Sequence, residues 1–356
     1  MSRSLIWLTS LAACQDLPPF VSPDDVAASP NPPLVEAPWR VERVQQSVPE
    51  QVDVLWVIDN SGSMADEQAA LIGAFPSFIR YFADSGLDWH IGVVTTDADA
   101  PGEGGKLQGA AGLRYLEPDA PDPIQTFAAM ARVGTDGSSD EQGRRVAWLA
   151  LTTPLVDGYN HGFYREDASL HVIVISDEPD ATVEPRLNEF VAWMGALKAD
   201  PDDATLSAIV GPRGGCAGPG GRFAEDGGTY LDAARATGGL TASICAEDWI
   251  PLLDELGLHA TRLRTEVFLG QIPVPDTIEV TVTADDYLYD GAIDPEGATA
   301  EGCDPIQPSS PAAEACADGA SCFHWRYDCT RNSVQITDWV PPRGSVIEVR
   351  YQLRDR

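Results

Sequence analysis

VDVLWVIDNSGSM, residues 52–64, is the stretch that decides the fold of this chain. Six of its first seven residues are Val, Leu, Trp or Ile, and only Asp53 interrupts the run. An apolar run of this length predicts a strand buried on both faces, as at the centre of a parallel sheet. The run ends in Asp59, Ser61 and Ser63, with turn-forming residues between them. The strand therefore presents one carboxylate and two hydroxyls at the carboxyl edge of the sheet.

These three side chains offer hard oxygen ligands at alternate positions. Such ligands suit Mg²⁺, Mn²⁺ or Ca²⁺ better than zinc or copper. The Asp-x-Ser-x-Ser spacing, after an apolar strand and before a helical pattern, resembles the motif of von Willebrand factor A (VWA) domains. In those domains the motif builds a metal-ion-dependent adhesion site, or MIDAS. The resemblance implies a VWA fold with Mg²⁺, or else Ca²⁺ or Mn²⁺, bound by Asp59, Ser61 and Ser63.

A second apolar run, residues 170–175, ends in Ser-Asp-Glu. The VWA resemblance makes Asp177 in this turn the remaining carboxylate of the metal site. Open α/β sheets bind their ligands at the carboxyl ends of their strands. We therefore expect Asp177 to lie on the same edge of the sheet as Asp59.

The polar loop 133–143 precedes a helix that we expect over 141–151. In the VWA resemblance, a loop of this kind supplies a threonine ligand, and Thr135 is the residue that we assign. Ser138 and Ser139 are the alternatives, because the spacing from Thr135 to Gly143 is longer than the usual pattern.

Strand and helix patterns alternate from 52 to 263, which predicts a doubly wound, mostly parallel α/β sheet. From Thr265 the pattern changes to period-two alternation, which predicts a small all-β sandwich. We therefore expect a VWA domain over 46–264 and a β-sandwich domain over 265–356. The second part resembles the β-domains that follow VWA domains in some bacterial surface lipoproteins.

The N-terminal segment MSRSLIWLTSLAACQ predicts export. Its apolar stretch is too short to span a bilayer and is typical of a signal peptide. Leu11 to Cys14 resembles the lipobox of bacterial lipoproteins, which implies lipidation of Cys14 and cleavage after residue 13; an ordinary cleavage site is the alternative. Gln15 in place of Asp implies outer-membrane sorting by the same analogy. We expect a lipid-anchored protein of the bacterial cell envelope, in the outer membrane or at the cell surface, with a proline-rich tether over 15–45. The end of this tether, Arg40 to Gln46, is also a candidate for a lead-in strand of the folded part.

The cysteines after Cys14 are even in number, which predicts disulfides in an exported chain. We pair Cys216 with Cys245, since each directly follows one of two predicted neighbouring strands. A nested pairing of Cys303 with Cys329 and of Cys316 with Cys322 is one choice among several connectivities. The chain has no CxxC or HExxH motif, so we expect no zinc site.

The chain carries 23 Lys and Arg against 55 Asp and Glu, a net charge of −32. Such a surface repels nucleic acid and anionic lipid, so neither is expected as a direct partner. Ser61 is not in a Gly-x-Ser-x-Gly elbow, and the glycine-rich stretch 214–221 lacks the Gly-Lys-Ser/Thr of a phosphate loop. We therefore expect no enzyme.

The function that we expect is metal-dependent protein binding, as an adhesin or an envelope scaffold. In the VWA resemblance, an ion held mainly by neutral hydroxyls leaves a coordination position for an Asp or Glu of a partner protein. One alternative is a purely structural metal with binding through the β-domain. Another is a metal-dependent hydrolase that uses Asp59 and Asp177.

Overall fold

β2 (Gln51–Ile58) is a central strand of a six-stranded sheet with the order β4-β3-β2-β5-β6-β9. The computed structural model describes residues 38–46, 49–83, 86–100, 102–219, 222–285, 287–293 and 322–353. All neighbouring strands of this sheet run parallel except β4, which is antiparallel to β3. The other strands are β3 (Asp88–Thr95), β4 (Tyr115–Leu116), β5 (Ser169–Ser176), β6 (Ala204–Val210) and β9 (Thr241–Ser243).

Helices cover both faces of this sheet. Alternate residues of β2 therefore pack into two different apolar cores. Val54, Trp56 and Ile58 belong to one core, while Leu55 and Val57 belong to the other. Among the described residues the helices are α1 (Ala65–Ala83), α2 (Pro123–Met130), α3 (Gly143–Ala150), α4 (Leu187–Met194), α5 (Thr229–Ala236) and α6 (Ile250–Thr261). The first core includes residues of α1, α2 and α6, and the second includes residues of α3, α4 and α5. The mixed α/β architecture with a largely parallel sheet therefore agrees with the sequence pattern.

Trp56 anchors the first core. It is fully buried, and its ring meets Phe78 and Phe127 edge-on at centroid distances of 5.1 and 5.7 Å. Edge-to-face contacts of this kind add to the free energy gained by burial. A cluster of packed aromatic rings thus holds the carboxyl-terminal part of β2 in place.

Asp53, the one charged residue in β2, is also fully buried. Its Oδ1 accepts from Arg165 Nε at 2.9 Å and its Oδ2 from Arg165 N at 2.7 Å. A buried carboxylate is tolerated when it is paired and hydrogen-bonded in this way. This pair lies at the amino end of the strand and explains the interruption in its apolar run.

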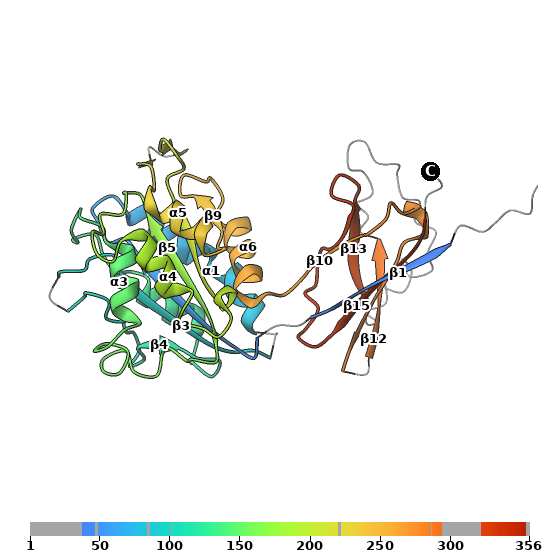
Figure 1. Ribbon diagram of the computed structural model, residues 1–356, viewed down its shortest axis with the longest axis horizontal. Helices are drawn as coiled ribbons and strands as arrows, with labels where there is room; N and C mark the ends of the chain where they lie inside the picture. The colour runs from blue at the N-terminus through green and yellow to red at the C-terminus, as the bar shows by residue number, and fades with distance from the viewer. Residues whose placement is uncertain are drawn as a thin grey trace, which may run out of the picture.

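The second lobe is a seven-stranded sheet with the order β1-β15-β11-β12-β13-β14-β10 around a third core (Figure 1). Its strands are β1 (Trp39–Gln45), β10 (Glu266–Phe268), β11 (Glu279–Ala284), β12 (Tyr287–Ile293), β13 (Cys322–Asp328), β14 (Ser333–Ile336) and β15 (Val346–Gln352). The all-β character agrees with the period-two pattern. The expected two-sheet sandwich is wrong for the described strands, because the parallel pairing of β12 with β13 joins them into one sheet.

The tether bound of 45 is also wrong, whereas the candidate lead-in strand at Arg40 to Gln46 is confirmed. Residues 39–45 form β1, which pairs antiparallel with β15 from Trp39 opposite Gln352 to Gln45 opposite Val346. The strand is largely exposed, so its sequence carries little apolar alternation. It is held mainly by backbone hydrogen bonds to an edge that β15 provides, which a sequence pattern does not reveal.

Gln46 hydrogen-bonds to the second chain segment that connects the two lobes. Its side chain donates to Arg264 O at 2.7 Å and accepts from Arg264 N at 3.0 Å, while its backbone bonds to Gly344 and Ser345. The side chain is buried, so each of these bonds replaces a lost contact with water. The chain thus enters the α/β lobe at residues 46–50 and leaves it at 262–265, with the two passages fixed beside each other.

The predicted disulfide between Cys216 and Cys245 is confirmed, with a Cα–Cα distance of 6.2 Å. It joins the segments that follow the adjacent parallel strands β6 and β9. Cys322 and Cys329 are disulfide-bonded as well, but Cys303 and Cys316 lie outside the described residues, as do Cys14 and the expected signal peptide. Within the described parts of the chain, no helix has the length and apolar character needed to cross a membrane.

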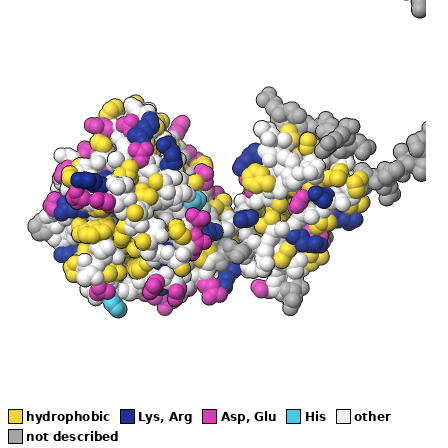
Figure 2. Space-filling view, in the orientation of Figure 1, with side chains coloured by type: hydrophobic (Ala, Val, Ile, Leu, Met, Phe, Trp, Pro, Cys, Tyr) yellow, Lys and Arg dark blue, Asp and Glu magenta, His cyan; other side chains and the backbone are white. Residues whose placement is uncertain are grey.

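Acidic side chains are spread over the visible face of both lobes, with Lys and Arg side chains between them (Figure 2). No large single-sign basic surface is seen on this face. On this face the acidic side chains gather mainly on the α/β lobe (Figure 2).

Candidate functional site

The carboxyl ends of β2 and β5 lie side by side and bring the two acidic turns together. Ile58 pairs with Ile175, and Asp59 N donates to Ile175 O at 3.0 Å. Asp59 is fully buried, and its Oδ1 accepts from Ser61 N at 2.7 Å. Its Oδ2 accepts from the Ser176 hydroxyl, also at 2.7 Å. Both oxygens of Asp59 are therefore fixed by donors at the edge of the sheet.

Ser63 connects the first turn to the second. Its hydroxyl lies 3.3 Å from that of Ser61, and it forms a hydrogen bond to Asp177 that lowers the pKa of this carboxyl, although burial has the larger effect and raises it. The other oxygen of Asp177, Oδ1, is buried and has no hydrogen-bond partner. Asp59, Ser61, Ser63 and Asp177 are thus brought together at one edge.

The loop that contains the expected third hydroxyl lies against this motif. The Gln68 side chain donates both to Asp59 O at 3.1 Å and to Gly134 O at 2.8 Å. Gly137 N donates to Asn60 O at 2.8 Å, and a Cβ at Gly137 would come within 2.5 Å of the Asn60 side chain. The close approach of the two backbones therefore depends on a glycine at 137.

The three residues that could supply the third hydroxyl, Thr135, Ser138 and Ser139, have different surroundings. The backbone carbonyl of Thr135 lies beside Gly62, while the Ser138 hydroxyl accepts from Asp140 N at 2.9 Å. Ser139 is exposed. None of the hydrogen bonds found among the described residues joins one of these hydroxyls to Asp59 or Asp177. The choice of Thr135 over its alternatives stays a prediction.

Two further acidic residues lie at this edge, and of these only Glu141 was not expected there from the sequence. Glu141 is 1% exposed, and burial together with the nearby Asp59 raises the pKa of its carboxyl to about 8. Burial and the charges of Asp59 and Asp177 raise the pKa of Glu178 to about 7. The sequence analysis placed Glu141 at the start of a helix. In the structure α3 begins only at Gly143, so Glu141 lies in the loop before it. For Glu178, its position directly after Asp177 at a strand end was the available signal.

An open hollow of about 360 Å³ leads from solvent to Ser63 and Asp177. Its far wall carries Arg222, Phe223 and Glu225, and Phe223 is 66% exposed. This wall belongs to the segment 211–228, which the disulfide at Cys216 and the hairpin of β7 (Cys216–Ala217) and β8 (Phe223–Ala224) hold in place. Glu225 N also donates to Asp177 O at 2.8 Å, so the wall is attached directly to the site.

The donor set fits a hard divalent cation. Buried oxygen atoms without a hydrogen-bond partner of normal geometry belong to Asp177, Thr96, Glu141, Glu67 and Asn60, and the Thr96 hydroxyl lies beside the Glu141 carboxyl. Carboxylate, hydroxyl and amide oxygens are the ligands of Mg²⁺ and Ca²⁺. Within the described residues, however, no three His, Cys, Asp or Glu side chains are grouped so that they could hold a metal ion. The predicted set contains only two carboxylates and relies on hydroxyls for the rest.

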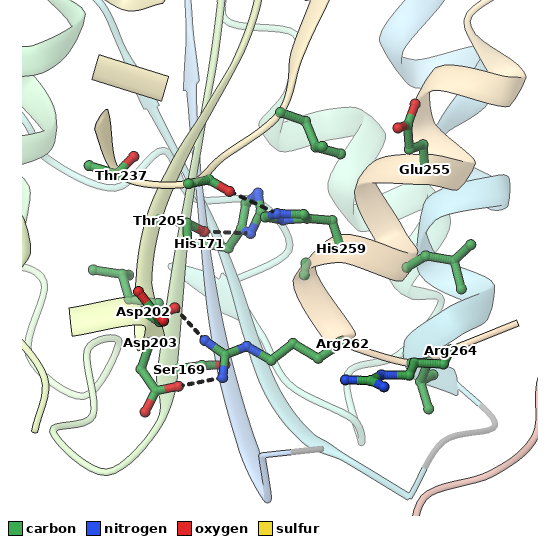
Figure 3. A pocket seen from close by; sticks show the side chains of 16 residues that line it. Ser169, His171, Asp202, Asp203, Thr205, Thr237, Glu255, His259, Arg262 and Arg264 are labelled. Atoms are coloured by element: carbon green, nitrogen blue, oxygen red, sulfur yellow. Dashed lines mark hydrogen bonds and ion pairs between the residues drawn. The ribbon is translucent and has the colours of Figure 1, made fainter. Parts of the chain in front are cut away.

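A larger hollow of about 730 Å³ lies near the amino ends of β5 and β6, next to α6 (Figure 3). His171 is buried there, with its two ring nitrogens 3.0 Å from the hydroxyls of Thr205 and Ser207. Burial and the neighbouring His259 lower the pKa of His171 well below its usual value, so this ring is neutral. Both nitrogens are occupied by protein groups, and the ring packs edge-on against His259. We attribute this histidine to packing.

Comparison with known proteins leaves the family open. No family model matches the chain, and no curated protein matches it. Among solved structures, the conserved hypothetical protein BatB from Bacteroides thetaiotaomicron is similar at 14% identity over 59% of this chain and 98% of that one, with a TM-score of 0.37. Proximal thread matrix protein 1 from the mussel byssus is similar at 16% identity over 65% and 52%, with a TM-score of 0.37. The pilus adhesin SpaC from Lactobacillus rhamnosus GG is similar at 8% identity over 89% and 43%, with a TM-score of 0.38.

The chain spans about half of the mussel protein and less than half of the pilus adhesin. TM-scores at this level do not establish a shared fold. The class that the geometry itself defines is a mixed α/β protein with an oxygen-lined site at the carboxyl edge of its parallel sheet.

Proposed function

We propose that this chain is a VWA-type binding protein in which a divalent cation, Mg²⁺ or else Ca²⁺ or Mn²⁺, docks a carboxylate of a partner protein. Asp59, Ser61, Ser63 and Asp177 would hold the ion, with Thr135 or one of its alternatives in the loop. The observation that carries the proposal is the buried Oδ1 of Asp177, which has no hydrogen-bond partner and lies at the base of an open hollow. A buried carboxylate oxygen without a donor is unfavourable unless a cation or water satisfies it.

The hollow gives a partner access to such an ion. The charged residues of its lining are acidic except for Arg222, so an acidic partner would be repelled in the absence of the cation. A bound divalent ion offsets the charge of Asp59 and Asp177 and supplies a coordination position for an Asp or Glu side chain. Partner binding should therefore require the metal.

The cellular setting is proposed from the N-terminal sequence. The lipobox-like Leu-Ala-Ala-Cys supports a lipid anchor at Cys14 and a location in the bacterial envelope. One lipid chain alone binds membranes weakly, so stable anchoring requires several chains on this cysteine. We propose a signal peptide and lipobox over 1–14, a tether that ends before Trp39, a VWA domain over 46–264 and a β-domain over 265–356 to which β1 contributes a strand.

The contacts of the two metal-site carboxylates favour binding over hydrolysis. Among the described residues, no recorded hydrogen bond or ion pair joins a His or Lys to Asp59 or Asp177. A general base or a proton donor for the leaving group would have to stand within hydrogen-bond reach of the reacting atoms. The alternative in which the metal only stabilises the fold makes a different prediction and is separated from the proposal by the same experiment.

The experiment has two parts. Calorimetry with Mn²⁺ and Ca²⁺ compares the metal-free wild type with Asp59→Ala and with Asp119→Ala, an exposed control outside the site. Capture of proteins from envelope extract is then repeated with the same three proteins, with and without EDTA.

We expect Asp59→Ala to lose both ion binding and capture, and Asp119→Ala to retain both. Capture that persists in EDTA and in Asp59→Ala would refute the docking role. Loss of thermal stability in EDTA with unchanged capture would identify a structural metal.

A further inference from the structure

A hollow of about 440 Å³ lies between α3 and α4, on the face of the sheet that carries the second core. Two tryptophans line it, Trp148 from α3 and Trp193 from α4. Both side chains are partly buried and pack against the second core. Figure 2 shows hydrophobic side chains gathered on this face of the α/β lobe, over the region that Figure 1 labels α3. The hollow shares no lining residue with the one at Asp177.

Each of the two helices presents one face to the hollow. Arg145 and Trp148 are three residues apart on α3, and Glu189 and Trp193 are four apart on α4. Side chains at these spacings lie on the same side of a helix. The ring of Trp193 also contacts the fully buried Phe190 at a centroid distance of 5.4 Å, so its position is set by the core.

The third wall of the hollow consists of Glu184 and Pro185, in the segment between β5 and α4. The buried side chain of Arg144 holds this segment in place. It donates to Thr182 O and to Pro185 O, each at 3.0 Å, and forms an ion pair with Asp180. The hollow is therefore formed by the protein alone, and a ligand does not have to order its walls.

The charges around the hollow favour a cationic ligand. Glu184 and Glu189 are exposed carboxylates of its lining. Arg145 also lines the hollow, but an ion pair with Asp99 at 3.3 Å offsets its charge. Arg186 Nε lies 3.7 Å from Glu184, and because both side chains are exposed this pair is weak. The excess of negative charge attracts cations to this surface.

The tryptophans determine which kind of cation fits. An indole ring attracts a cation placed over its face, and it does so more strongly than the ring of Tyr or Phe. A metal ion requires a cage of oxygen ligands, and within the described residues no three His, Cys, Asp or Glu side chains are grouped to hold one. A methylated ammonium group combines positive charge with an apolar surface, so it matches both the indole walls and the carboxylates.

We propose that this hollow binds a methylated ammonium group, with Trp148 and Trp193 as its walls and with Glu184 and Glu189 balancing its charge. The group belongs either to a free molecule such as choline or to the headgroup of a choline lipid. The site does not depend on the proposed function, because it contains none of the residues assigned to the divalent ion. Asp59→Ala should therefore bind such a ligand as well as the wild type.

The test is a titration of the full-length protein, followed by tryptophan fluorescence and by calorimetry. The ligands are choline, glycerophosphocholine as the soluble headgroup of a choline lipid, and the neutral analogue of choline in which a tert-butyl group replaces the trimethylammonium group. We expect the neutral analogue to bind at least about fivefold more weakly than choline, since it cannot make a cation–π contact.

Four variants locate the site. Trp148→Leu keeps an apolar side chain against the core and should weaken choline binding at least about fivefold. Glu184→Gln should weaken it about twofold to threefold, because an exposed charge contributes little. The matched controls are Trp39→Leu, at a tryptophan that is 39% exposed in the other lobe, and Glu117→Gln, at an exposed position outside the hollow. Both controls should bind choline like the wild type.

The outcomes separate the alternatives. Equal affinity for choline and its neutral analogue would overturn the proposal, as would the absence of binding by the wild type. Unchanged affinity in both Trp148→Leu and Glu184→Gln would place the ligand elsewhere and would also overturn it. If thermal unfolding shows that Trp148→Leu is not folded, Trp148→Phe takes its place and should show a smaller loss in the same direction. Tighter binding of glycerophosphocholine than of choline would assign the site to a lipid headgroup, and the reverse to a free molecule.

Discussion

The metal-free protein should lose stability as the pH rises through the neutral range, and Glu141 should be the main cause. Burial and Asp59 raise the pKa of this carboxyl from 4.5 to about 8 in the folded state. A carboxyl with a raised pKa binds its proton more tightly when folded than when unfolded. Its contribution is therefore fully present below pH 4.5 and is lost as the pH rises toward 8, which is opposite to the behaviour of a salt-bridged acid.

The size of the effect follows from the shift in pKa. Each pH unit between the unfolded and folded values corresponds to about 1.4 kcal/mol. A shift from 4.5 to about 8 therefore sets an upper limit of about 5 kcal/mol on the loss, with about 2 kcal/mol lost by pH 6. Losses of this size are a large fraction of the stability of a typical domain.

The assay is urea unfolding in EDTA at several pH values from 4.5 to 9, for the wild type and for Glu141→Gln. The difference between the two free energies of unfolding reports the titration of Glu141 together with its coupling to Asp59 and Glu178, because those carboxyls are present in both proteins but interact with its charge only in the wild type. The wild type should lose stability relative to the variant by at least 2 kcal/mol between pH 5 and 8. A difference that stays constant with pH would refute the reasoning. Added Ca²⁺ should flatten the wild-type profile, because a bound cation favours the ionised form.

Three other perturbations test the elements around the site. Asp53→Asn removes a buried charge-assisted hydrogen bond while Arg165 keeps its ion pair with Asp88, and it should lower the free energy of unfolding by about 1.5–3 kcal/mol in urea titrations, whereas an unchanged free energy would mean that solvent reaches the pair. Cys216→Ser with Cys245→Ser opens a loop with a sequence separation of 29 and should cost about 3.5 kcal/mol by the same assay; an unchanged midpoint of unfolding would contradict this. Gly137→Ala places a methyl within 2.5 Å of the Asn60 side chain and should weaken Mn²⁺ binding by calorimetry about tenfold while costing only about 1–3 kcal/mol of stability, and full Mn²⁺ affinity would show that the loop is not part of the site.

The sequence pattern was sufficient wherever the structure follows from one strand and its turn. The run at 52–58 is buried on both faces, and the turn residues Asp59 and Asp177 meet because parallel strands share an edge. The disulfide was also predictable, since it closes two neighbouring strands of one sheet. These features depend on local composition and on a general rule of sheet topology.

The features that the pattern missed depend on distant partners. Glu141 resembles any solvated acid before a helix, and only the packing of three separate segments shows that it is buried without a counterion. The strand at 39–45 has an unremarkable polar sequence, and its pairing is decided by a free edge more than 300 residues away along the chain. The single β sheet likewise depends on the parallel contact of β12 with β13, which crosses a long stretch of sequence.

The position of β1 has a mechanical consequence. A pulling force applied at Trp39 acts along β1 and is passed to β15 through the ladder that joins the two strands. β1 is hydrogen-bonded to β15 over its whole length, and β2 is hydrogen-bonded to neighbours on both sides. Ladder bonds that cross the pulling direction are loaded together rather than one after another. β1 and β15 therefore resist tension at Trp39 together, and the helices around the candidate site take no part in this ladder.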